Sequence, residues 1–379
     1  MAAVQTSGVD AALAGGRLTV DLGALVRNWQ KLAVLAPSAE TGAVVKADAY
    51  GLGAEPVVRA LAKAGCRTFF VAFSHEGAAV HKAAPEARIF VLTGAEAPEY
   101  GAYVKSGLTP MLSSGEQLRL WLAEGPPLPF GINADTGMNR LGLHAGEAAM
   151  LGADGAILQA AGLCHIMSHL ACADDPAHPM NMQQLKVFQR LAEIHSDVES
   201  SLANSAGIFL GSAFHFDVTR PGIALYGGEA VNGVPNPMEP VARLETRVLQ
   251  IRNAKAGETV SYGAAVTLQR DTRIAVCGTG YADGFHRASG AGVAMRKTGQ
   301  PAGFGFIAGK KVPILGRVTM DLTMFDVTRL PEGAVKIGDF IELFGGNIAL
   351  DDAARAAGTI GYEMLTGLGA RCSRQYLTA

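Results

Sequence analysis

The stretch Ala43-Val-Val-Lys46-Ala-Asp-Ala-Tyr50-Gly-Leu-Gly53 sets the pattern for the first half of the chain. An apolar strand pattern ends in a lysine, a Gly-rich turn follows, and a helical pattern covers residues 56–61. A lysine at the end of a buried strand loses hydration, which lowers its pKa and makes the neutral amine a nucleophile toward carbonyl compounds. The alternative is a lysine whose side chain reaches from the strand end into water. A single lysine does not decide between these two interpretations.

Short apolar segments alternate with helical patterns from this stretch to about residue 219. Helices are predicted, for example, over residues 115–123 and 182–195. This alternation predicts a (β/α)8 barrel of the TIM type, with an open doubly wound sheet as the alternative. No Gly-x-Gly-x-x-Gly follows the first strand, which argues against a dinucleotide site. The predicted strands cover residues 44–46, 69–73, 88–92, 110–112, 130–133, 162–169, 201–204 and 216–219.

The chain changes character at residues 227–240, where glycine and proline become frequent. After this connector most predicted elements are strands, so a mostly β C-terminal domain is expected over residues 241–379. Its predicted elements are strands at 242–251, 258–261, 274–277, 305–307, 311–314 and 340–343, and a helical segment at 351–365. The barrel is expected over residues 17–240, with residues 17–21 a candidate strand for the C-terminal domain. Residues 1–16 are expected to be a flexible tail.

The composition indicates a well-packed protein with no nucleic-acid or membrane partner. Only 17% of the 379 residues are charged, against roughly 25% in an average globular protein, so a large core is expected. The net charge of −2 gives no electrostatic reason to expect nucleic acid or an anionic membrane. No apolar stretch is long enough to span a bilayer. Five cysteines without a Cys-x-x-Cys pair indicate reduced thiols and a cytoplasmic location.

The predicted barrel places several reactive side chains on one face. In such barrels the site lies at the carboxyl ends of the strands, and the loops after strands seven and eight often bind phosphate. Lys46 ends the first predicted strand, Asn204 and Ser205 end the seventh, and Arg220 and Gly222 follow the eighth. The Ser205 hydroxyl and the backbone at Gly222 suit a phosphate. A lysine-linked, phosphorylated cofactor such as pyridoxal phosphate is therefore favoured.

With these positions in place, the sequence resembles the alanine-racemase-like, fold-type III pyridoxal phosphate enzymes over nearly its whole length, from about residue 18 onward. Eight motifs in the same order carry the resemblance. They are Val44-Val-Lys46-Ala-Asp-Ala-Tyr50-Gly, Asp135-Thr-Gly-Met-Asn-Arg140-Leu-Gly, Ser168-His169-Leu-Ala-Cys-Ala-Asp174, Ala203-Asn204-Ser205-Ala, Arg220-Pro-Gly222-Ile223-Ala-Leu-Tyr-Gly, Val260-Ser-Tyr262-Gly, Gly280-Tyr281-Ala-Asp-Gly284 and Gly316-Arg-Val-Thr319-Met320-Asp321.

The resemblance implies a role for each matching residue. Lys46 would bind pyridoxal 5'-phosphate as a Schiff base and act as one catalytic base, and Tyr262 would be the second base on the opposite face of the substrate. Arg220 would face the pyridine nitrogen, and His169 would join Arg220 to Tyr262. The other cofactor contacts implied are Tyr50, Asn204, Ser205, Gly222, Ile223 and Tyr362. The substrate contacts implied are Arg140, Met320, Tyr281 and Asp321, with Arg287 at the mouth of the channel.

These roles agree with the chemistry of racemisation. A proton must leave one face of the α-carbon and return on the other, which requires two groups. A free tyrosine has a pKa near 10, and a hydrogen-bond chain from Tyr262 through His169 to Arg220 would stabilise its phenolate. An arginine keeps its proton, so Arg220 would leave the pyridine nitrogen unprotonated and suppress transamination. His165 and His169 have a spacing that suits a helical metal pair, but their segment is a predicted strand and no metal is expected.

One position departs from the family pattern. Many members carry a carbamylated lysine seven residues before the motif arginine, and the residue at that position is Asn133. Asparagine cannot form a carbamate, so Arg140 lacks that anionic partner. A bound chloride near Asn133 and Arg140, or a direct bond from the Asn133 carbonyl, would take its place.

The family's activities leave several functions to compare. The first is interconversion of L- and D-alanine, for peptidoglycan or for alanine catabolism, by a homodimer whose sites are shared between chains. A serine or broad-specificity racemase is the alternative on the same scaffold. A decarboxylase of this fold places an acidic residue where Arg220 stands, and a non-catalytic pyridoxal-phosphate-binding protein consists of the barrel alone. Arg220 and the β domain therefore argue against these last two.

Overall fold

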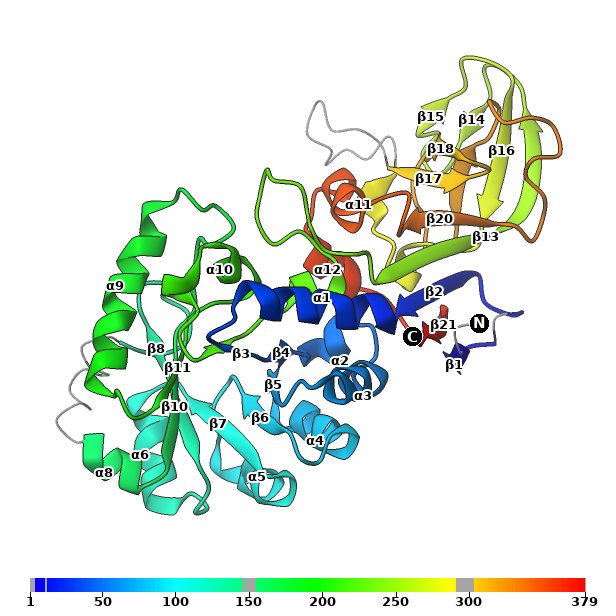
Figure 1. Cartoon of the computed structure of the whole chain (residues 1–379). Coiled ribbons are helices and arrows are strands. Elements are labelled where there is room, and N and C mark those ends of the chain that lie inside the picture. The colour runs from blue at the N-terminus through cyan, green and yellow to red at the C-terminus, as the bar shows by residue number, and fades with distance from the viewer. Residues whose placement is uncertain (1–3, 11, 145–146, 148–154, 291–302, 379) are drawn as a thin grey trace. The chain divides into compact units, whose positions relative to one another are not determined.

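The structure is a computed structural model that describes residues 4–10, 12–144, 147, 155–290 and 303–378 (Figure 1). It divides into two compact units. One consists of Leu25–Leu225 and Glu229–Met238, and the other of Met1–Ala24, Tyr226–Gly228 and Glu239–Ala379. The domain boundaries predicted from the sequence, 17–240 and 241–379, stay predictions.

The first unit is the predicted parallel barrel. Seven parallel strands pair in the order β11-β10-β8-β7-β6-β5-β4, and β12 pairs in parallel with β3. Backbone hydrogen bonds from Asp217 N to Ser200 O (3.0 Å) and from Arg220 N to Ala203 O (2.8 Å) join the β12 segment to the end of β11. The strands are β3 (Glu40–Thr41), β4 (Ala43–Val44), β5 (Thr68–Val71), β6 (Arg88–Val91), β7 (Leu108–Leu112), β8 (Phe130–Asp135), β10 (Leu163–Met167), β11 (Glu199–Ser201) and β12 (Val218–Thr219), with the short β9 (Leu143–His144) beside β8.

Helices follow the strands around the outside of this sheet, as Figure 1 shows for α3 to α6. Their apolar faces pack inward, because most residues of the intervening strands are buried in the barrel core. Phe70 and Phe90 stack in that core with ring centroids 5.3 Å apart. The helices are α1 (Leu22–Leu35), α3 (Ala54–Ala64), α4 (Ser74–Ala83), α5 (Tyr100–Ser106), α6 (Gly115–Glu124), α8 (Gly155–Ala160), α9 (Pro179–Ile194) and α10 (Ser205–Phe209).

The predicted strand over residues 44–46 is wrong in one respect. Strand β4 ends at Val44, and Lys46 starts the segment α2 (Lys46–Tyr50). Residues 47–50 all have positive φ, between 52° and 56°, so α2 is a single left-handed turn. The φ of a β-strand is negative, and the left-handed turn therefore ends the strand before the lysine.

The second unit contains the mostly β domain. Its main sheet has the order β1-β21-β2-β13-β20-β17-β18, and β16 pairs with both β13 and β19. The long strand β13 (Ala242–Ala254) contacts β2, β16 and β20 and so organises the sheet. The other strands are β14 (Thr259–Val260), β15 (Val266–Thr267), β16 (Thr272–Cys277), β17 (Phe304–Ile307), β18 (Lys310–Pro313), β19 (Thr323–Asp326) and β20 (Phe340–Phe344), and the helices are α11 (Leu350–Ala357) and α12 (Gly361–Thr366).

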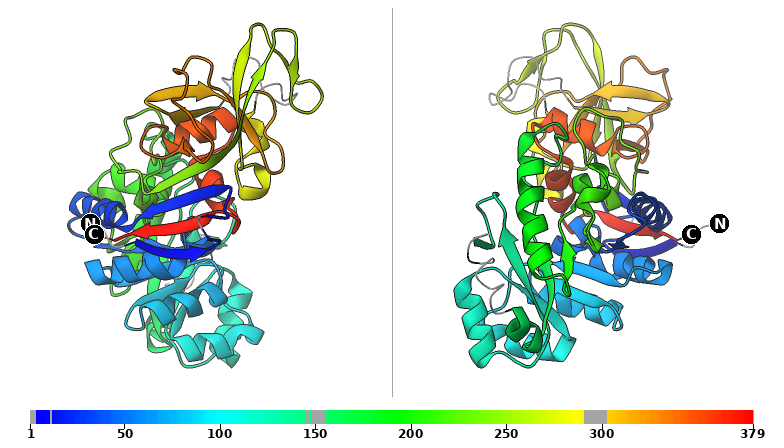
Figure 2. Two further views of the ribbon diagram at one scale, coloured as in Figure 1. Left: turned by 90° about the vertical axis from the view of Figure 1, so that its right-hand side faces the viewer. Right: turned by 60° about the vertical axis from the view of Figure 1, so that its left-hand side comes forward.

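Both ends of the chain belong to this sheet. In Figure 2 the red strand β21 (Ser373–Leu377) lies between the two blue strands β1 (Val4–Gly8) and β2 (Gly16–Asp21). Strand β2 runs parallel to β21 and antiparallel to β13. The first sixteen residues, expected to be a flexible tail, thus include one strand, and the segment 17–21 pairs with the C-terminal domain.

Two further observations concern the helices and the cysteines. None of the helices in the described part of the chain is long and apolar enough to cross a membrane. All five cysteines lie in that part, and all are free thiols. Burial raises the pKa of Cys66 to about 12 and that of Cys164 to about 11, so these two thiols are poor nucleophiles.

Candidate active site

Lys46 lies at the carboxyl end of β4, where the left-handed turn α2 begins. Burial lowers its pKa, and the positive charge of Arg140 lowers it further, while the negative charge of Glu76 acts in the opposite direction. An amine with a lowered pKa is more often neutral and is a better nucleophile. This result supports the reactive lysine over the solvent-reaching alternative.

Hydrogen bonds hold the turn after Lys46 in its strained conformation. A left-handed residue other than glycine costs roughly 1–2 kcal/mol, and four such residues follow Lys46 directly. Gly51 N donates to Ala47 O at 2.7 Å, and Ala54 N donates to the side chain of Asp48 at 2.7 Å. Such strain is common at functional sites, where the surrounding structure fixes the geometry.

The loops after the seventh and eighth strands form a small polar cradle. The Ser205 hydroxyl accepts hydrogen bonds from Gly222 N at 2.8 Å and from Ala224 N at 3.2 Å. A Cβ atom at Gly222 would lie 2.3 Å from the Tyr50 hydroxyl oxygen, so a larger residue there would displace the Tyr50 side chain. Ile223 is buried beside it. Backbone N–H and hydroxyl groups are the donors that bind a phosphate, so residues of this kind suit a phosphorylated group.

Asn204 and Arg220 connect the same two loops. The Asn204 side chain caps α10 by accepting a hydrogen bond from Gly207 N at 2.9 Å, and the backbones of Asn204 and Arg220 form a parallel bridge. The Arg220 guanidinium is buried and donates to the Ser201 hydroxyl and to the carbonyls of Ser168 (2.5 Å) and Leu202 (3.4 Å). Burial lowers its pKa to about 10, which still leaves it protonated at neutral pH.

His169 follows β10 and is half-buried. Burial lowers its pKa to about 3, and the positive charges of Arg220, Arg140 and Lys46 add to this effect. The imidazole is therefore neutral at physiological pH. In the described part of the chain, no hydrogen bond joins the His169 and Arg220 side chains. The link between them that the resemblance implies stays a prediction.

Arg140 lies on an exposed loop. The side chains of Asn133, which is buried, and Asp135, which is half-buried, fix the backbone of this loop. The Asp135 carboxylate accepts hydrogen bonds from Gly137 N, Met138 N and Arg140 N at 2.8, 2.8 and 3.2 Å. The Asn133 amide donates to the Leu141 carbonyl at 2.8 Å. Among the described residues the Asn133 carbonyl makes no bond to Arg140, so Asn133 fixes the loop and not the guanidinium.

Three predicted site residues of the β domain lie together. Tyr281 N donates to Thr319 O, and Ala282 N donates to Met320 O, each at 3.0 Å. The Met320 side chain is exposed, as is Tyr281. The neighbouring Asp321 carboxylate forms a 2.8 Å ion pair with Arg371. The structure thus brings Tyr281, Met320 and Asp321 to one surface of this domain.

The proposed second base, Tyr262, follows β14 and is 75% exposed. Its neighbour Ser261 has a φ of 71° and donates a hydrogen bond to Arg317 O at 3.1 Å. Tyr362, on α12, and Arg287 are also exposed. The side chain of Tyr262 therefore has very little protein around it within its own domain.

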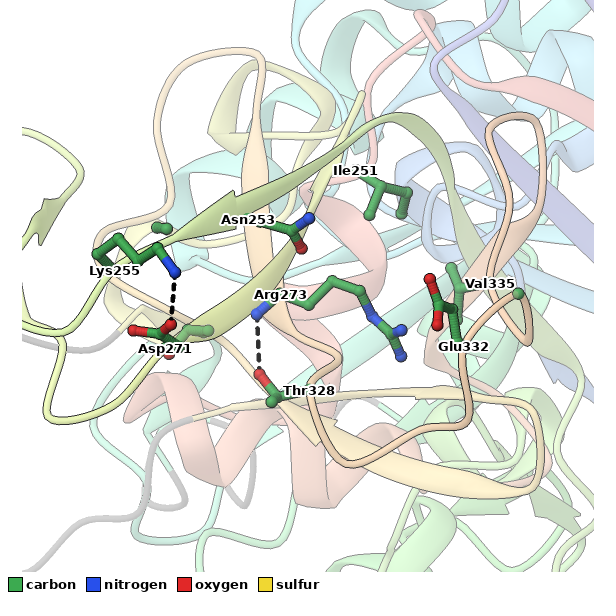
Figure 3. Close-up of a pocket in the computed structure, with 11 residues that line it drawn as sticks. Ile251, Asn253, Lys255, Asp271, Arg273, Thr328, Glu332 and Val335 are labelled. Carbon is green, nitrogen blue, oxygen red and sulfur yellow. Dashed lines mark hydrogen bonds and ion pairs between the residues drawn. The ribbon is translucent and has the colours of Figure 1, made fainter.

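A separate hollow lies on the β domain (Figure 3), with a volume of about 590 Å³. None of the predicted site residues lines it. Lys255 and Asp271 form an exposed ion pair at 2.8 Å, and the Arg273 guanidinium donates to the carbonyls of Val327, Leu330 and Pro331. These charged groups already have partners, so the hollow is a poor candidate for the active site.

Sequence reasoning missed two residues that shape the site. Glu76 accepts a hydrogen bond from Ala47 N at 2.6 Å, next to Lys46. Gln184, on α9, is fully buried and contacts the backbone on both sides of Leu170. A signal for Gln184 exists in the sequence, because it occupies the helical stripe that also contains Leu185, Phe188 and Leu191.

The fold and the site together define a two-domain protein: a (β/α)8 barrel with a desolvated lysine and a polar, glycine-lined cradle, followed by a mostly β domain. Two family models match almost the whole chain. They are the alanine racemase N-terminal domain, over residues 20–230, and the alanine racemase C-terminal domain, over residues 241–376. The chain belongs to the alanine racemase family.

Individual relatives agree with this assignment. The biosynthetic alanine racemase of Agrobacterium fabrum is 53% identical over 367 residues, covering 96% of this chain and 94% of the relative. The catabolic alanine racemase of the same organism is 44% identical over 369 residues, covering 96% and 92%. The crystal structure of alanine racemase from Bartonella henselae with covalently bound pyridoxal phosphate has a TM-score of 0.87 and 36% identity, covering 96% of this chain and all of that one.

Proposed function

We propose that the protein is a pyridoxal-phosphate-dependent racemase that interconverts L-alanine and D-alanine. The observation that carries this proposal is the pair formed by Lys46, with its lowered pKa, and the cradle of Ser205, Gly222 and Tyr50. A cofactor with a carbonyl and a phosphate matches these two features. The family and its relatives named alanine racemase supply the substrate.

In this proposal each residue acts on a specific part of the site. When bound, pyridoxal phosphate withdraws electrons from the amino acid and makes its α-proton acidic. Ser205 and the Gly222 backbone would hold the phosphate, and the Arg220 guanidinium would lie toward the pyridine nitrogen. Lys46 Nζ would hold the cofactor and exchange a proton on one face of the α-carbon. Tyr262 Oη would exchange a proton on the other face.

Other residues would bind the cofactor and the substrate around these groups. Arg140 would bind the alanine carboxylate as a cation close to Lys46, and Met320 would contact the same carboxylate. Tyr281 and Asp321 would line the substrate path, with His169 between Arg220 and Tyr262. Asn204, Ile223 and Tyr362 would complete the cofactor site.

We further propose that two chains build each site in a homodimer. Tyr262, Met320 and Tyr281 are 75%, 54% and 42% exposed. Large apolar and aromatic side chains gain free energy when a partner covers them. A two-fold dimer would bring Tyr262 and Met320 of one chain to the barrel of the other and give two equivalent sites.

A chloride near Asn133 and Arg140 is the remaining partner that we propose. The amide of Asn133 donates to the Leu141 carbonyl, which leaves the Arg140 guanidinium to be balanced by another anion. A cytoplasmic location agrees with the free thiols. The relatives include both biosynthetic and catabolic enzymes, so D-alanine supply for peptidoglycan and alanine catabolism both remain possible roles.

The test is to incubate the holoenzyme with L-alanine and to detect D-alanine on a chiral column. Wild-type protein should be yellow and form D-alanine, and borohydride should attach the cofactor to the peptide that contains Lys46. Lys46→Ala should be colourless and inactive. A panel that includes L-serine tests the broad-specificity alternative. Cofactor binding without D-amino acid from any substrate would instead indicate a non-catalytic binding protein.

A further inference from the structure

Gln184 makes three hydrogen bonds in the interior of the barrel unit. Its Nε2 donates to His169 O at 2.8 Å and to the Thr136 hydroxyl at 3.1 Å. Its Oε1 accepts a hydrogen bond from Ala171 N at 2.9 Å. One amide from α9 therefore binds the backbone segment 168–171 on both sides of Leu170.

The same contacts continue to Arg220. The hydroxyls of Thr136 and Ser168 form a hydrogen bond of 2.7 Å, directly after strands β8 and β10. The Ser168 carbonyl accepts the 2.5 Å hydrogen bond from Arg220. Gln184, Thr136, Ser168 and Arg220 thus form one buried polar chain. His169 lies on the segment that this chain holds.

The position of Gln184 makes these contacts costly to lose. It belongs to the buried face of α9, on which an unpaired amide would lose its hydration without compensation. Two of the three bonds reach the backbone of the segment 168–171, and the third reaches the Thr136 hydroxyl, which bonds to Ser168. The side chain therefore acts on the backbone next to His169, and among the described residues it makes no hydrogen bond to Ser205 or Gly222.

We propose that Gln184 is a positioning residue of the reaction, an inference that rests on the proposed function. It fixes the segment 168–171, so that the Ser168 carbonyl holds the Arg220 guanidinium in one orientation and His169 stays beside it. Gln184 contacts neither substrate nor cofactor. Its effect on the reaction passes through Arg220 and His169, the two groups assigned to the pyridine nitrogen and to the link with Tyr262.

The test compares the holoenzymes of wild type, Gln184→Leu and Gln184→Glu. Gln184→Leu has similar size and removes all three bonds, whereas Gln184→Glu keeps the acceptor for Ala171 N and loses both donors. A misplaced catalytic group of this kind lowers kcat about 10- to 100-fold. We expect that fall in both variants, with the Kd for pyridoxal phosphate within about threefold of wild type because the phosphate cradle is separate.

Reaction specificity is the second readout. If Arg220 loses its fixed orientation, it would no longer keep the pyridine nitrogen unprotonated. Transamination should then compete with racemisation. We expect more pyruvate per D-alanine formed and a changed visible absorbance spectrum of the bound cofactor. A residue that serves only folding would change neither quantity.

Asn181→Leu is the matched control. Asn181 is also buried on α9 and donates to a backbone carbonyl, that of Asp175, at 2.9 Å. Within the described part of the chain, it makes no hydrogen bond to the segment 168–171. Asn181→Leu should lower Tm while keeping kcat and the pyruvate ratio of wild type.

The outcomes separate this inference from the proposed function. An active wild type whose Gln184 variants keep kcat, spectrum and pyruvate ratio would overturn the positioning role alone. An inactive wild type would overturn the proposed function. If Gln184→Leu does not fold, the isosteric Gln184→Glu decides, because it retains the side-chain volume and one of the three bonds.

Discussion

The Glu76 carboxylate accepts a hydrogen bond from Ala47 N at 2.6 Å, across 29 residues of sequence. Its second oxygen accepts hydrogen bonds from Ala72 N and Phe73 N at 2.8 and 3.1 Å. One carboxylate thus connects the turn after Lys46 to the N-terminus of α4. It also raises the pKa of Lys46, against the larger effects of burial and Arg140.

Replacing this carboxylate should destabilise the fold and remove a negative charge near Lys46. Glu76→Gln puts an amide –NH2 where an oxygen now accepts, so at least one backbone N–H loses its partner. We expect the free energy of unfolding to fall by about 1.5–3 kcal/mol, measured by urea denaturation of the cofactor-free protein. Glu55→Gln, in an exposed pair with Arg59, should change it by less than about 0.5 kcal/mol. Equal effects of the two substitutions would contradict this prediction.

Ala47 is exposed and has a φ of 53°, in the left-handed region that favours glycine. Ala47→Gly should stabilise the protein by about 0.5–1 kcal/mol, because relief of the left-handed strain exceeds the added entropy of the unfolded chain. The control Ala62→Gly, inside the regular helix α3, should destabilise it by about 1 kcal/mol. Urea denaturation of both variants measures whether each substitution raises or lowers the free energy of unfolding. Destabilisation by Ala47→Gly would show that the turn is not strained.

The neutral His169 predicts a loss of stability in acid. Its pKa is about 3 in the folded protein against an ordinary value of 6.5, so the unfolded state binds more protons between these values. Stability is therefore fully present above pH 6.5 and falls as the pH falls, by up to about 1.4 kcal/mol per pH unit. His169→Gln should reduce that slope by about this amount between roughly pH 4.5 and 6.

Other groups must be held constant in this measurement. His165, whose pKa burial also lowers, is present in both proteins and contributes equally. The exposed His144→Gln is the matched control for replacing a histidine by glutamine. Urea denaturation across this pH range measures the slopes. An unchanged slope for His169→Gln would mean that the imidazole is not held neutral.

The shared-site dimer predicts complementation between two inactive variants. Lys46→Ala and Tyr262→Phe should each be nearly inactive. After mixing in equal amounts, dissociation and reassembly, half of the dimers contain both chains, and each mixed dimer has one site with both bases intact. About a quarter of wild-type activity should return. No recovery, with mixed dimers verified by mass, would place both bases on one chain.

The proposed chloride predicts a salt effect specific to that ion. If chloride balances Arg140, replacing it by a bulky anion at constant ionic strength should raise the KM for alanine, because the guanidinium that binds the substrate carboxylate is less well held. Steady-state kinetics over a chloride series measures this effect. Asp352→Asn, which removes an exposed charge that pairs with Arg355 on α11, should show the wild-type chloride response. Identical KM values in both anions would contradict the chloride site.

The sequence was informative where a local pattern fixes the structure. The apolar run Thr68–Val71 is β5, and the helix expected over residues 182–195 is most of α9. The order of these elements predicts the barrel, because alternating strands and helices form parallel sheets. The motifs around Lys46 and Arg220 could be recognised for the same reason, since each is contiguous in sequence.

Features that depend on distant contacts could not be predicted in this way. The strand before Lys46 ends early because of a turn that the Glu76 carboxylate, far along the chain, helps to hold. Strand β19 has no clear alternation in Thr323–Asp326 and is fixed by pairing with β16. Gln184 lies on the apolar stripe of an amphipathic helix, but its partners His169, Ala171 and Thr136 lie elsewhere in the sequence, and only the structure shows them.

The pairing of the two chain ends has a consequence for synthesis on the ribosome. Strand β2 emerges early, but its neighbours β13 and β21 follow much later; Gln375, which bonds to Thr19, lies 356 residues downstream. At about 5–20 residues per second, β2 waits roughly 20–70 seconds for β21. The barrel can fold during that interval, whereas the β domain can close only after the last strand is released. Nascent chains stalled before β21 should therefore expose an unpaired strand edge that a chaperone could bind.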